Sequence, residues 1–353
     1  MRDFEVTSDD QSAIGADAAA FEIIVVVRPG MFTTFQDVGR PGHARFGVSP
    51  SGAMDRSAHL CAAALVGNDP AAAALELTGP GAEFRFLRAC RFALVGADLD
   101  ARLGDLPLAL PFVGDAAADA RLTFGTRKHG ARCMFAVAGG FATKRPFGSA
   151  AVDVTGGVGP YAEPGGTTRP LPAGIRLRAV DALQAAGRVP VDASVRSSQQ
   201  AAWREFRPEL ATTSTQPTIL RFIPEEEGGV ALPTARAFAA HTWRLSSRSN
   251  RAGFRFDGEP LMVAADPERL SEPTAPGAIQ LPPDGLPILL MADRNTTGGY
   301  PRLGHLASCD RDKAAQLWPG DAVCFEPITA ADAQSALRTA HRQLEKLLSA
   351  LRP

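Results

Sequence analysis

Glycine and proline interrupt this sequence so often that long regular elements are excluded over most of its length. The 353 residues include 34 glycines and 28 prolines, and the apolar runs between them are short. Short apolar runs bounded by turn residues, as in Arg28-Pro29-Gly30 or Asp257-Gly258, are typical of β-strands. The sequence therefore predicts a mainly β protein whose strands close, or nearly close, into barrels that leave few exposed edges. The expected strands cover residues 23–28, 83–86, 92–95, 133–138, 175–180, 218–223, 242–246, 288–292 and 322–325.

Only a few helices are expected. Asp55 is a good N-cap for a helix that runs through Leu65 and stops at Gly67. A second, short helix is predicted over residues 234–240, and the clearest one over residues 329–351. The last has an apolar stripe with members three and four residues apart, which makes it amphipathic. This stripe would pack either on the chain's own barrel or against another subunit. Its members are Leu337, Ala340, Leu344, Leu347 and Leu351.

The chain is long enough for two domains of ordinary size. Residues 191–216 are rich in Ser, Gln, Thr and Ala and have no strand pattern, so we expect a linker there. The linker would join a first barrel over residues 21–190 to a second over residues 217–328, and residues 329–353 would form the C-terminal helix. Residues 1–20 are acidic and rich in small side chains, which predicts a disordered tail.

Composition excludes several classes of protein. The formal net charge is −1, which argues against a nucleic-acid partner. The five cysteines show no CxxC spacing and the six histidines form no H-x-x-x-H pair, so we expect neither a disulfide framework nor a bound metal. The N-terminus lacks the pattern of a signal peptide, and no apolar run is long enough to cross a membrane. A cytoplasmic protein with no membrane partner is expected.

Familiar catalytic signatures are missing, so the chemistry must come from other segments. The sequence has no GxxxxGK[ST] phosphate loop, no glycine-rich turn that opens a dinucleotide-binding helix, and no G-x-S-x-G elbow. Four polar segments punctuated by glycine remain, each at the end of an expected strand.

The first two of these segments lie near the N-terminus. Residues 32–43 include Gln36, Asp37 and Arg40, and the planar donor fork of Arg40 suits a carboxylate or a phosphate. Alternatively, Asp37 only caps the turn and pairs with Arg40. Residues 47–55 lead into a helix start, which favours an anion. Because the capping aspartate is expected to take those N–H donors itself, a structural role is favoured for this second segment.

The third segment, residues 245–258, crowds polar side chains that include Asn250 and Arg251 before an expected strand. Gly253 permits a close approach of the backbone, so the segment is either an anion-binding loop or a solvated one.

The fourth segment is the most informative. It combines Gln280 with a polar run that follows a strongly apolar strand at residues 287–292. Asp293 could act as a base or orient a neighbour. Two hydroxyls and two glycine N–H groups could meet a ligand or a developing oxyanion, and a tyrosine could form a wall. A purely structural turn is the alternative. These groups belong to Thr296, Thr297, Gly298, Gly299 and Tyr300.

The same segments resemble a family whose members are labelled as the C subunit of 5-oxoprolinase, as allophanate hydrolase subunit 2, and as biotin-dependent carboxyltransferase subdomains A and B. The resemblance covers roughly residues 23–328. Two stretches depart from the usual family pattern, because Gly148-Ser149 is followed by two alanines and Arg251 is followed by Ala252. The matching stretches are Thr33-Thr-Phe-Gln-Asp-Val-Gly-Arg, Ser51-Gly-Ala-Met-Asp, Leu65-Val-Gly-Asn, Leu75-Glu-Leu-Thr, Asn250-Arg, Gly277-Ala-Ile-Gln, Thr296-Thr-Gly-Gly-Tyr-Pro and Pro319-Gly-Asp.

The resemblance implies two cyclophilin-like β-barrel subdomains and a role in a hetero-oligomer. The companion would resemble the B subunit of 5-oxoprolinase or allophanate hydrolase subunit 1, and a lactam-utilisation protein is a further partner to consider. ATP with Mg would act in the assembled complex. Biotin would come only from a separate carrier, because this chain has no Ala-Met-Lys-Met stretch.

The four polar segments supply the expected site residues, with no metal ligand among them. The expected catalytic residues are Asp293, Arg251, Arg40, Thr297 and Tyr300. The expected substrate- or nucleotide-binding residues are Gln36, Asp37, Asn250, Gln280, Thr296, Gly298 and Gly299. We expect Arg40, Arg251 and Asp293 to share one cleft around a small amide.

Three functions are consistent with the resemblance. The favoured one is a subunit of an ATP-dependent 5-oxoprolinase that opens a small cyclic amide, with Arg40 and Arg251 screening the charge that develops when the lactam oxygen is phosphorylated. The second is transfer of a carboxyl group from carboxybiotin to a urea-like amide. The third is a non-catalytic regulatory partner of the companion subunit.

Overall fold

The computed structural model describes residues 21–162, 168, 170–180, 193–210, 216–225, 232–263 and 270–352. The chain forms two compact units. The first unit contains residues 1–40, 55–213 and 344–353, and the second contains residues 41–54 and 214–343. The predicted tail at residues 1–20 lies outside the described residues.

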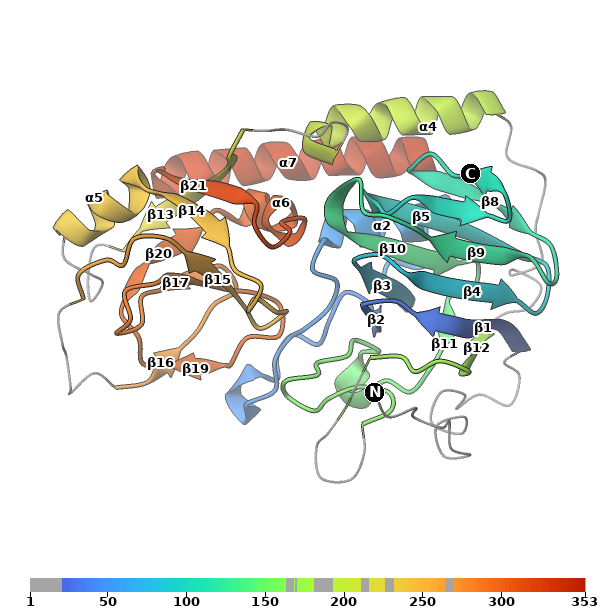
Figure 1. Ribbon diagram of the computed structural model, residues 1–353, viewed down its shortest axis with the longest axis horizontal. Coiled ribbons are helices and arrows are strands. Elements are labelled where there is room, and N and C mark those ends of the chain that lie inside the picture. The colour runs from blue at the N-terminus through green and yellow to red at the C-terminus, as the bar shows by residue number, and fades with distance from the viewer. Residues whose placement is uncertain are drawn as a thin grey trace. The chain divides into compact units, whose positions relative to one another are not determined.

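The first unit is built from two sheets. The seven-stranded sheet has the order β11-β12-β1-β4-β9-β6-β7, and the five-stranded sheet has the order β2-β3-β10-β5-β8. Helix α2 packs on β5 and β10 (Figure 1). The strands are β1 Phe21–Pro29, β2 Phe32–Gln36, β3 Ala74–Thr78, β4 Ala82–Phe86, β5 Cys90–Asp98, β6 Ala101–Leu103, β7 Leu106–Pro107, β8 Phe112–Ala116, β9 Arg121–Phe124, β10 His129–Val137, β11 Phe141–Ala142 and β12 Arg176–Ala179, and α2 is Arg56–Leu65.

Aromatic side chains from the two sheets form the core of the first unit. The ring centroid of Phe135 on β10 lies 5.3 Å from that of Phe84 on β4 and 6.1 Å from that of Phe141 on β11. These edge-to-face contacts are the arrangement that ring quadrupoles prefer. Because alternate residues of a strand face the same side, β4 sends both Phe84 and Phe86 into the core.

The second unit is a closed barrel with the order β13-β20-β17-β18-β15-β14-β21, in which β13 and β21 are parallel. A two-stranded sheet of β16 and β19 accompanies it. The barrel is filled by aromatic side chains, of which Trp243, Phe254 and Phe256 are almost fully buried. The strands are β13 Thr218–Pro224, β14 Thr242–Leu245, β15 Gly253–Asp257, β16 Glu272–Pro273, β17 Ala278–Gln280, β18 Ile288–Leu290, β19 Thr297–Gly298, β20 Arg302–Leu306 and β21 Ala322–Pro327.

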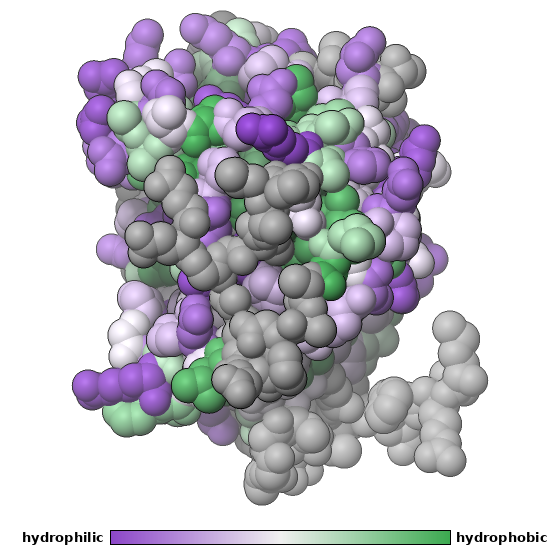
Figure 2. Space-filling model, turned by 90° about the vertical axis from the view of Figure 1, so that its left-hand side faces the viewer, coloured by the Kyte–Doolittle hydropathy of each residue, from purple (hydrophilic) through white to green (hydrophobic). Residues whose placement is uncertain are grey.

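Hydrophilic and hydrophobic residues are mixed on the face that Figure 2 shows, and neither kind covers it. Within the part of the chain that the structure describes, no helix has the length and apolar character needed to cross a membrane.

The predicted helices are confirmed. The Asp55 side chain accepts a hydrogen bond from the Ala58 N–H at 3.0 Å, as an N-cap does. The helix expected over residues 234–240 is α5, Leu232–Ala240, and the C-terminal one is α7, Ala330–Leu351. Thr329 caps α7 by accepting from the Asp332 N–H at 3.1 Å.

The segment expected to be a linker contains a helix of its own, α4, Ala193–Phe206, followed by the short helix η3, Pro208–Leu210. The two units divide between residues 213 and 214, inside that segment. Residues 41–54 belong with the second unit, which the sequence did not indicate.

The mainly β fold is confirmed, and each of the nine expected strands overlaps an observed one. Sequence analysis interpreted β2 only as part of a polar segment, because its sequence is Phe-Thr-Thr-Phe-Gln. Thr33 and Thr34 are nevertheless buried. The Thr33 hydroxyl donates to the Pro29 carbonyl at 2.6 Å, and the Thr34 hydroxyl accepts from Gln36 at 3.0 Å. These partners make burial of two polar side chains acceptable.

Candidate functional site

In the first unit, Asp37 holds a distant loop in place. Its side chain is 1% exposed and follows directly after β2. One carboxylate oxygen accepts from the Gly39 N–H at 2.8 Å and from the Ser149 hydroxyl at 2.6 Å. The other accepts from the Ala150 N–H at 2.8 Å and lies 3.4 Å from Arg145 Nη1. Asp37 therefore organises the loop at residues 149–151, where this sequence departs from the family pattern.

Arg40 and Gln36 contact the same loop. The buried Arg40 guanidinium donates to the Ala151 carbonyl, and Gln36 Nε2 donates to the Val152 carbonyl at 3.0 Å. Gln36 Oε1 is buried and accepts no hydrogen bond from the described residues. The structure therefore brings together the first polar segment and a loop that is more than one hundred residues later in the chain.

In the second unit, Arg251 and Asp293 form a buried two-point ion pair. Arg251 Nε lies 2.8 Å from Asp293 Oδ2, and Arg251 Nη2 lies 3.0 Å from Asp293 Oδ1. The two residues are 5% and 3% exposed. Such paired bonds fix the plane of both groups.

Two residues of the second polar segment form hydrogen bonds with this ion pair. The Ser51 hydroxyl donates to Asp293 Oδ1 at 2.7 Å, and the Gly52 carbonyl accepts from Arg251 Nη2 at 2.6 Å. Ser49 also donates its hydroxyl to the Ala292 carbonyl at 2.9 Å. With both carboxylate oxygens engaged, Asp293 is placed to orient Arg251 and the residues 49–52, and less well placed to remove a proton from a substrate. Sequence analysis did not single out Ser51, which stands in a matching stretch but gave no chemical signal of its own.

The third segment has a structural turn next to Arg251. The Asn250 side chain accepts from the backbone N–H groups of Ala252 at 2.9 Å and Gly253 at 3.2 Å. A Cβ atom at Gly253 would lie 3.0 Å from Ile288 Cγ2, so this glycine allows β15 to approach β18. The close approach that we expected toward a ligand is made to a neighbouring strand.

The fourth segment contributes β19, which pairs with β16 and lies near Gln280. Gln280 on β17 is 7% exposed, and a Cβ atom at Gly298 would lie only 2.7 Å from its Nε2 atom. A side chain at position 298 would therefore displace the end of the Gln280 side chain from its present place. Thr297 and Tyr300 are exposed, Tyr300 at 46%, whereas Thr296 and Gly299 are half-buried.

Arg294 is a polar residue that sequence analysis missed. It is 4% exposed, its Nη2 donates to the Thr274 carbonyl at 3.3 Å, and its Nε has no acceptor among the described residues. Burial, together with the nearby Arg311, lowers the pKa of Arg294 from its ordinary value. No carboxylate of the described residues forms an ion pair with Arg294, so it is a buried cation suited to an anion. In the sequence, only its position next to Asp293 could have indicated that Arg294 belongs to the site.

The two sets of residues belong to different units, and each is described by itself. Gln36, Asp37 and Arg40 lie in the first unit, and Arg251 and Asp293 lie in the second. A cleft shared by Arg40, Arg251 and Asp293 stays a prediction. Among the described residues, no group of three or more His, Cys, Asp or Glu side chains is arranged to hold a metal ion.

Most of the chain matches a known family. Residues 46–327 match the family described as carboxyltransferase domain, subdomain A and B. The chain belongs to this family. It is 34% identical to the 5-oxoprolinase C subunit of Escherichia coli (strain K12), over 92% of this chain and 97% of that protein. It is 30% identical to the 5-oxoprolinase C subunit of Haemophilus influenzae, over 89% of this chain and 94% of that protein.

A solved structure shares the fold of this chain. Kluyveromyces lactis urea carboxylase superposes with a TM-score of 0.79 at 23% identity, covering 94% of this chain and 30% of that one. At this identity the likeness concerns the fold alone. The family that the four segments indicated is thus confirmed, together with its mainly β architecture.

Proposed function

We propose that this chain is the C subunit of a 5-oxoprolinase-type complex, which opens a small cyclic amide at the expense of ATP. The observation that carries the proposal is the 34% identity to the Escherichia coli C subunit, which extends over 97% of that protein. The correspondence covers 92% of this chain, so the proposal rests on most of its length and not on a single motif. The companion would be of the 5-oxoprolinase B type, and a lactam-utilisation protein would be a further partner.

Arg294 is the residue that we propose to bind the substrate's carboxylate. 5-Oxoproline carries one carboxylate beside its lactam, and a buried guanidinium whose Nε lacks an acceptor is suited to such a group. Arg251 is less suited, because Asp293 and the Gly52 carbonyl already engage it. We assign Arg251 and Asp293 to positioning the loops around the site.

The Thr-Thr-Gly-Gly-Tyr stretch would meet the lactam itself. Thr297 and Tyr300 are exposed and free to turn toward a bound molecule, and Gln280 lies close to Gly298. Hydroxyl, amide and backbone N–H donors of this kind can hold the carbonyl oxygen while charge develops on it. Gly299 and Thr296 would add to the same set.

ATP with Mg belongs to this proposal as a component of the assembled complex, where it would supply the phosphoryl group that activates the lactam oxygen. The unmatched Nε of Arg294 fits an anion, whether carboxylate or phosphate, so the fit does not by itself select a nucleotide. This chain's own residues would bind and orient the amide and keep water from it.

The test is reconstitution. The chain is co-expressed with its companion subunits, and glutamate release from 5-oxoproline is followed with and without ATP. We expect ATP-dependent turnover, and we expect Arg294→Ala to raise KM for 5-oxoproline at least tenfold, the loss of one charge-assisted bond of about 1.5–3 kcal/mol. Arg248→Ala is the matched control, because Arg248 is an exposed arginine of the third segment paired with Asp257. Absence of turnover in an assembled complex would refute the proposal.

Carboxyl transfer is the second candidate function, and the family's own description favours it. It requires carboxybiotin on a separate carrier. Binding of a biotinylated carrier protein, combined with no release of glutamate from 5-oxoproline, would favour this function over the first.

A further inference from the structure

A short exposed turn of the second unit carries a phenylalanine that the described part of the chain leaves largely uncovered. The turn is the 3-10 helix η1, Ala44–Phe46, which has no buried residue. Phe46 is 65% exposed, more than any other phenylalanine, tyrosine or tryptophan that the structure describes. In Figure 1 the turn is the short blue helix drawn outside the barrel of its own unit. Because single exposed apolar side chains are common, this exposure alone does not indicate a binding surface.

Arg45 holds the Phe46 ring in one place. Its guanidinium carbon lies 4.6 Å from the centre of the ring, within the range of a cation–π contact. Arginine and aromatic residues are among the types enriched where proteins bind one another. A ring that is already held by a neighbour loses less conformational freedom when a partner covers it. Arg45 and Phe46 are therefore arranged to bind together.

The backbone of the turn is fixed as well. Gly47 closes it with a φ of 78° and donates its N–H to the Ala44 carbonyl at 3.0 Å. Just beyond, the Ser49 hydroxyl donates to the Ala292 carbonyl at 2.9 Å, which attaches the segment to its unit. A Cβ atom at Gly47 or at Gly42 would meet no atom within 4 Å. The turn is therefore anchored at its base, while no described part of the chain packs against these two positions.

The turn also carries a positive charge without a carboxylate partner. Residues 41–54 contain no aspartate or glutamate. Arg45 is exposed and forms no ion pair with the described residues. A partner that covers the Phe46 ring would also cover part of this guanidinium, and burying a cation is unfavourable unless a carboxylate comes with the partner. The charge therefore specifies an acidic rim around the surface that receives the ring.

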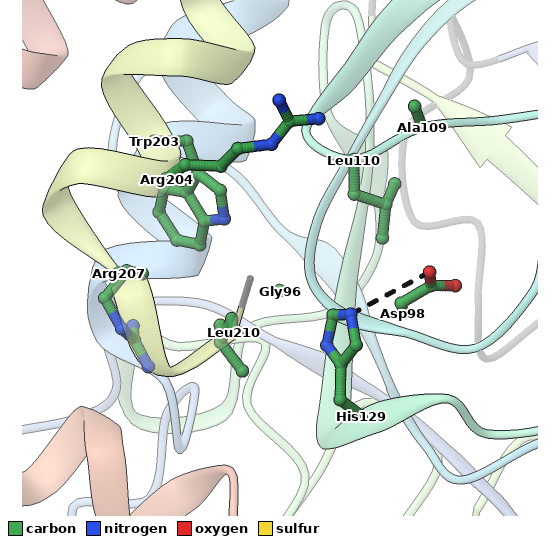
Figure 3. Close-up of a pocket in the computed structure, with 9 residues that line it drawn as sticks. All are labelled: Gly96, Asp98, Ala109, Leu110, His129, Trp203, Arg204, Arg207 and Leu210. Carbon is green, nitrogen blue, oxygen red and sulfur yellow. Dashed lines mark ion pairs between the residues drawn. The ribbon is translucent and has the colours of Figure 1, made fainter. Parts of the chain in front are cut away.

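The charged side chains that line a cavity of about 190 Å³ beside α4 in the first unit are balanced, in contrast to the turn (Figure 3). Arg207 has two carboxylate partners there. Burial lowers the pKa of His129, so this ring is neutral at neutral pH and Asp98 is left to offset Arg204. The cavity lining therefore has no charge over for a ligand, whereas the turn has one for a partner.

We propose that the turn at residues 44–46 docks this chain on its companion subunit, an inference that rests on the function proposed above. Phe46 would enter an apolar pocket of the companion, and carboxylates at the rim of that pocket would pair with Arg45. A few buried anchors of this kind carry most of the affinity of an interface. A lipid surface suits the turn less well, because stable membrane binding needs a larger apolar face or a lipid anchor.

The experiment measures the affinity of the full chain for its companion of the 5-oxoprolinase B type by calorimetry. We expect Phe46→Ala to weaken this binding by about tenfold or more, the effect of losing a central anchor. Because η1 has no buried residue, the variant should keep the melting temperature of wild type. Phe21→Ala is the matched control and should bind normally. Phe21 is also exposed, at 42%, and has an arginine guanidinium 5.5 Å from its ring, but it belongs to strand β1 of the first unit.

Arg45→Ala should weaken the binding less than Phe46→Ala does, and should make it less sensitive to salt. The reason is that ions in solution screen a pair of charges at the rim of an interface. Equal affinities of wild type and Phe46→Ala for the companion would overturn the docking site and leave the proposed complex intact. No binding of the companion by wild type would refute the proposed complex, and the docking site with it.

Two other binding partners of the turn are distinguished by the same variant. Vesicles of phosphatidylserine are sedimented with wild type and with Phe46→Ala, and the oligomeric state of both proteins is measured without the companion. We expect no difference between them in either assay. Phe46-dependent binding to the vesicles, or loss of a homodimer in Phe46→Ala, with the affinity for the companion unchanged, would overturn the inference.

Discussion

Asp37→Asn should destabilise the first unit by releasing the loop at residues 149–151. The substitution keeps one acceptor oxygen and replaces the other with an NH₂ group. That group cannot accept from the Ala150 N–H at 2.8 Å, or, if the amide is flipped, from Gly39 and Ser149. Hydrogen bonds to charged groups contribute about 1.5–3 kcal/mol, and a buried donor left without an acceptor costs about 1–3 kcal/mol.

The expected loss in the free energy of unfolding is about 2–4 kcal/mol, because the two effects overlap and the carboxylate no longer has to be buried as a charge. The ion pair with Arg145 adds little, since the Arg145 side chain is 37% exposed. With a urea dependence of about 3 kcal/mol per M, the unfolding midpoint should fall by on the order of 1 M.

Urea unfolding and hydrogen exchange are the two assays. The backbone amides of residues 149–151 should exchange faster in Asp37→Asn. If the loop opens only when the whole unit unfolds, the free energy of opening from hydrogen exchange should fall by as much as the free energy of unfolding. Asp69→Asn is the control, because Asp69 also accepts from a turn N–H, that of Ala71 at 2.7 Å, but is exposed. Equal midpoints for the two variants, or unchanged protection of the loop, would refute the reasoning.

Three further perturbations test other parts of the fold. Asp55→Ala removes an N-cap and one of the two carboxylate partners of the buried Arg207, which keeps Glu209, so unfolding should become easier by about 2–4 kcal/mol. Replacing Arg207 with Met as well should recover part of this loss, and additive urea results would contradict the reasoning. Burial lowers the pKa of His59 below its unfolded value near 6.5, so its contribution to stability is complete above about pH 6.5 and declines as the pH falls below that. His59→Gln should flatten the melting temperature between pH 5 and pH 7 (about the range in which histidine titrates), and an unchanged pH dependence would refute this. Burial alone would raise the pKa of Asp310, but hydrogen bonds from Arg221 lower this pKa overall. The contribution of Asp310 to stability is therefore present above its unfolded-state pKa and is lost as the pH falls through its folded-state pKa. Asp310→Asn should be less stable than wild type at neutral pH and equally stable in strong acid.

The sequence by itself determined the local structure. Short apolar runs between glycines and prolines located the nine strands that were expected, because strand formation depends on alternation and on turn residues close by. Asp55 located a helix start for the same reason, since a cap acts within three residues of itself. The motifs also indicated the family.

Only the tertiary structure decided which polar groups meet. Asp37 reaches Ser149, and Ser51 reaches Asp293, across more than one hundred residues of chain. Such contacts depend on strand register and on how sheets close, which no local pattern encodes. The unmatched Arg294 was equally invisible, because a missing partner is a property of the whole neighbourhood in the fold and not of the residue's own sequence context.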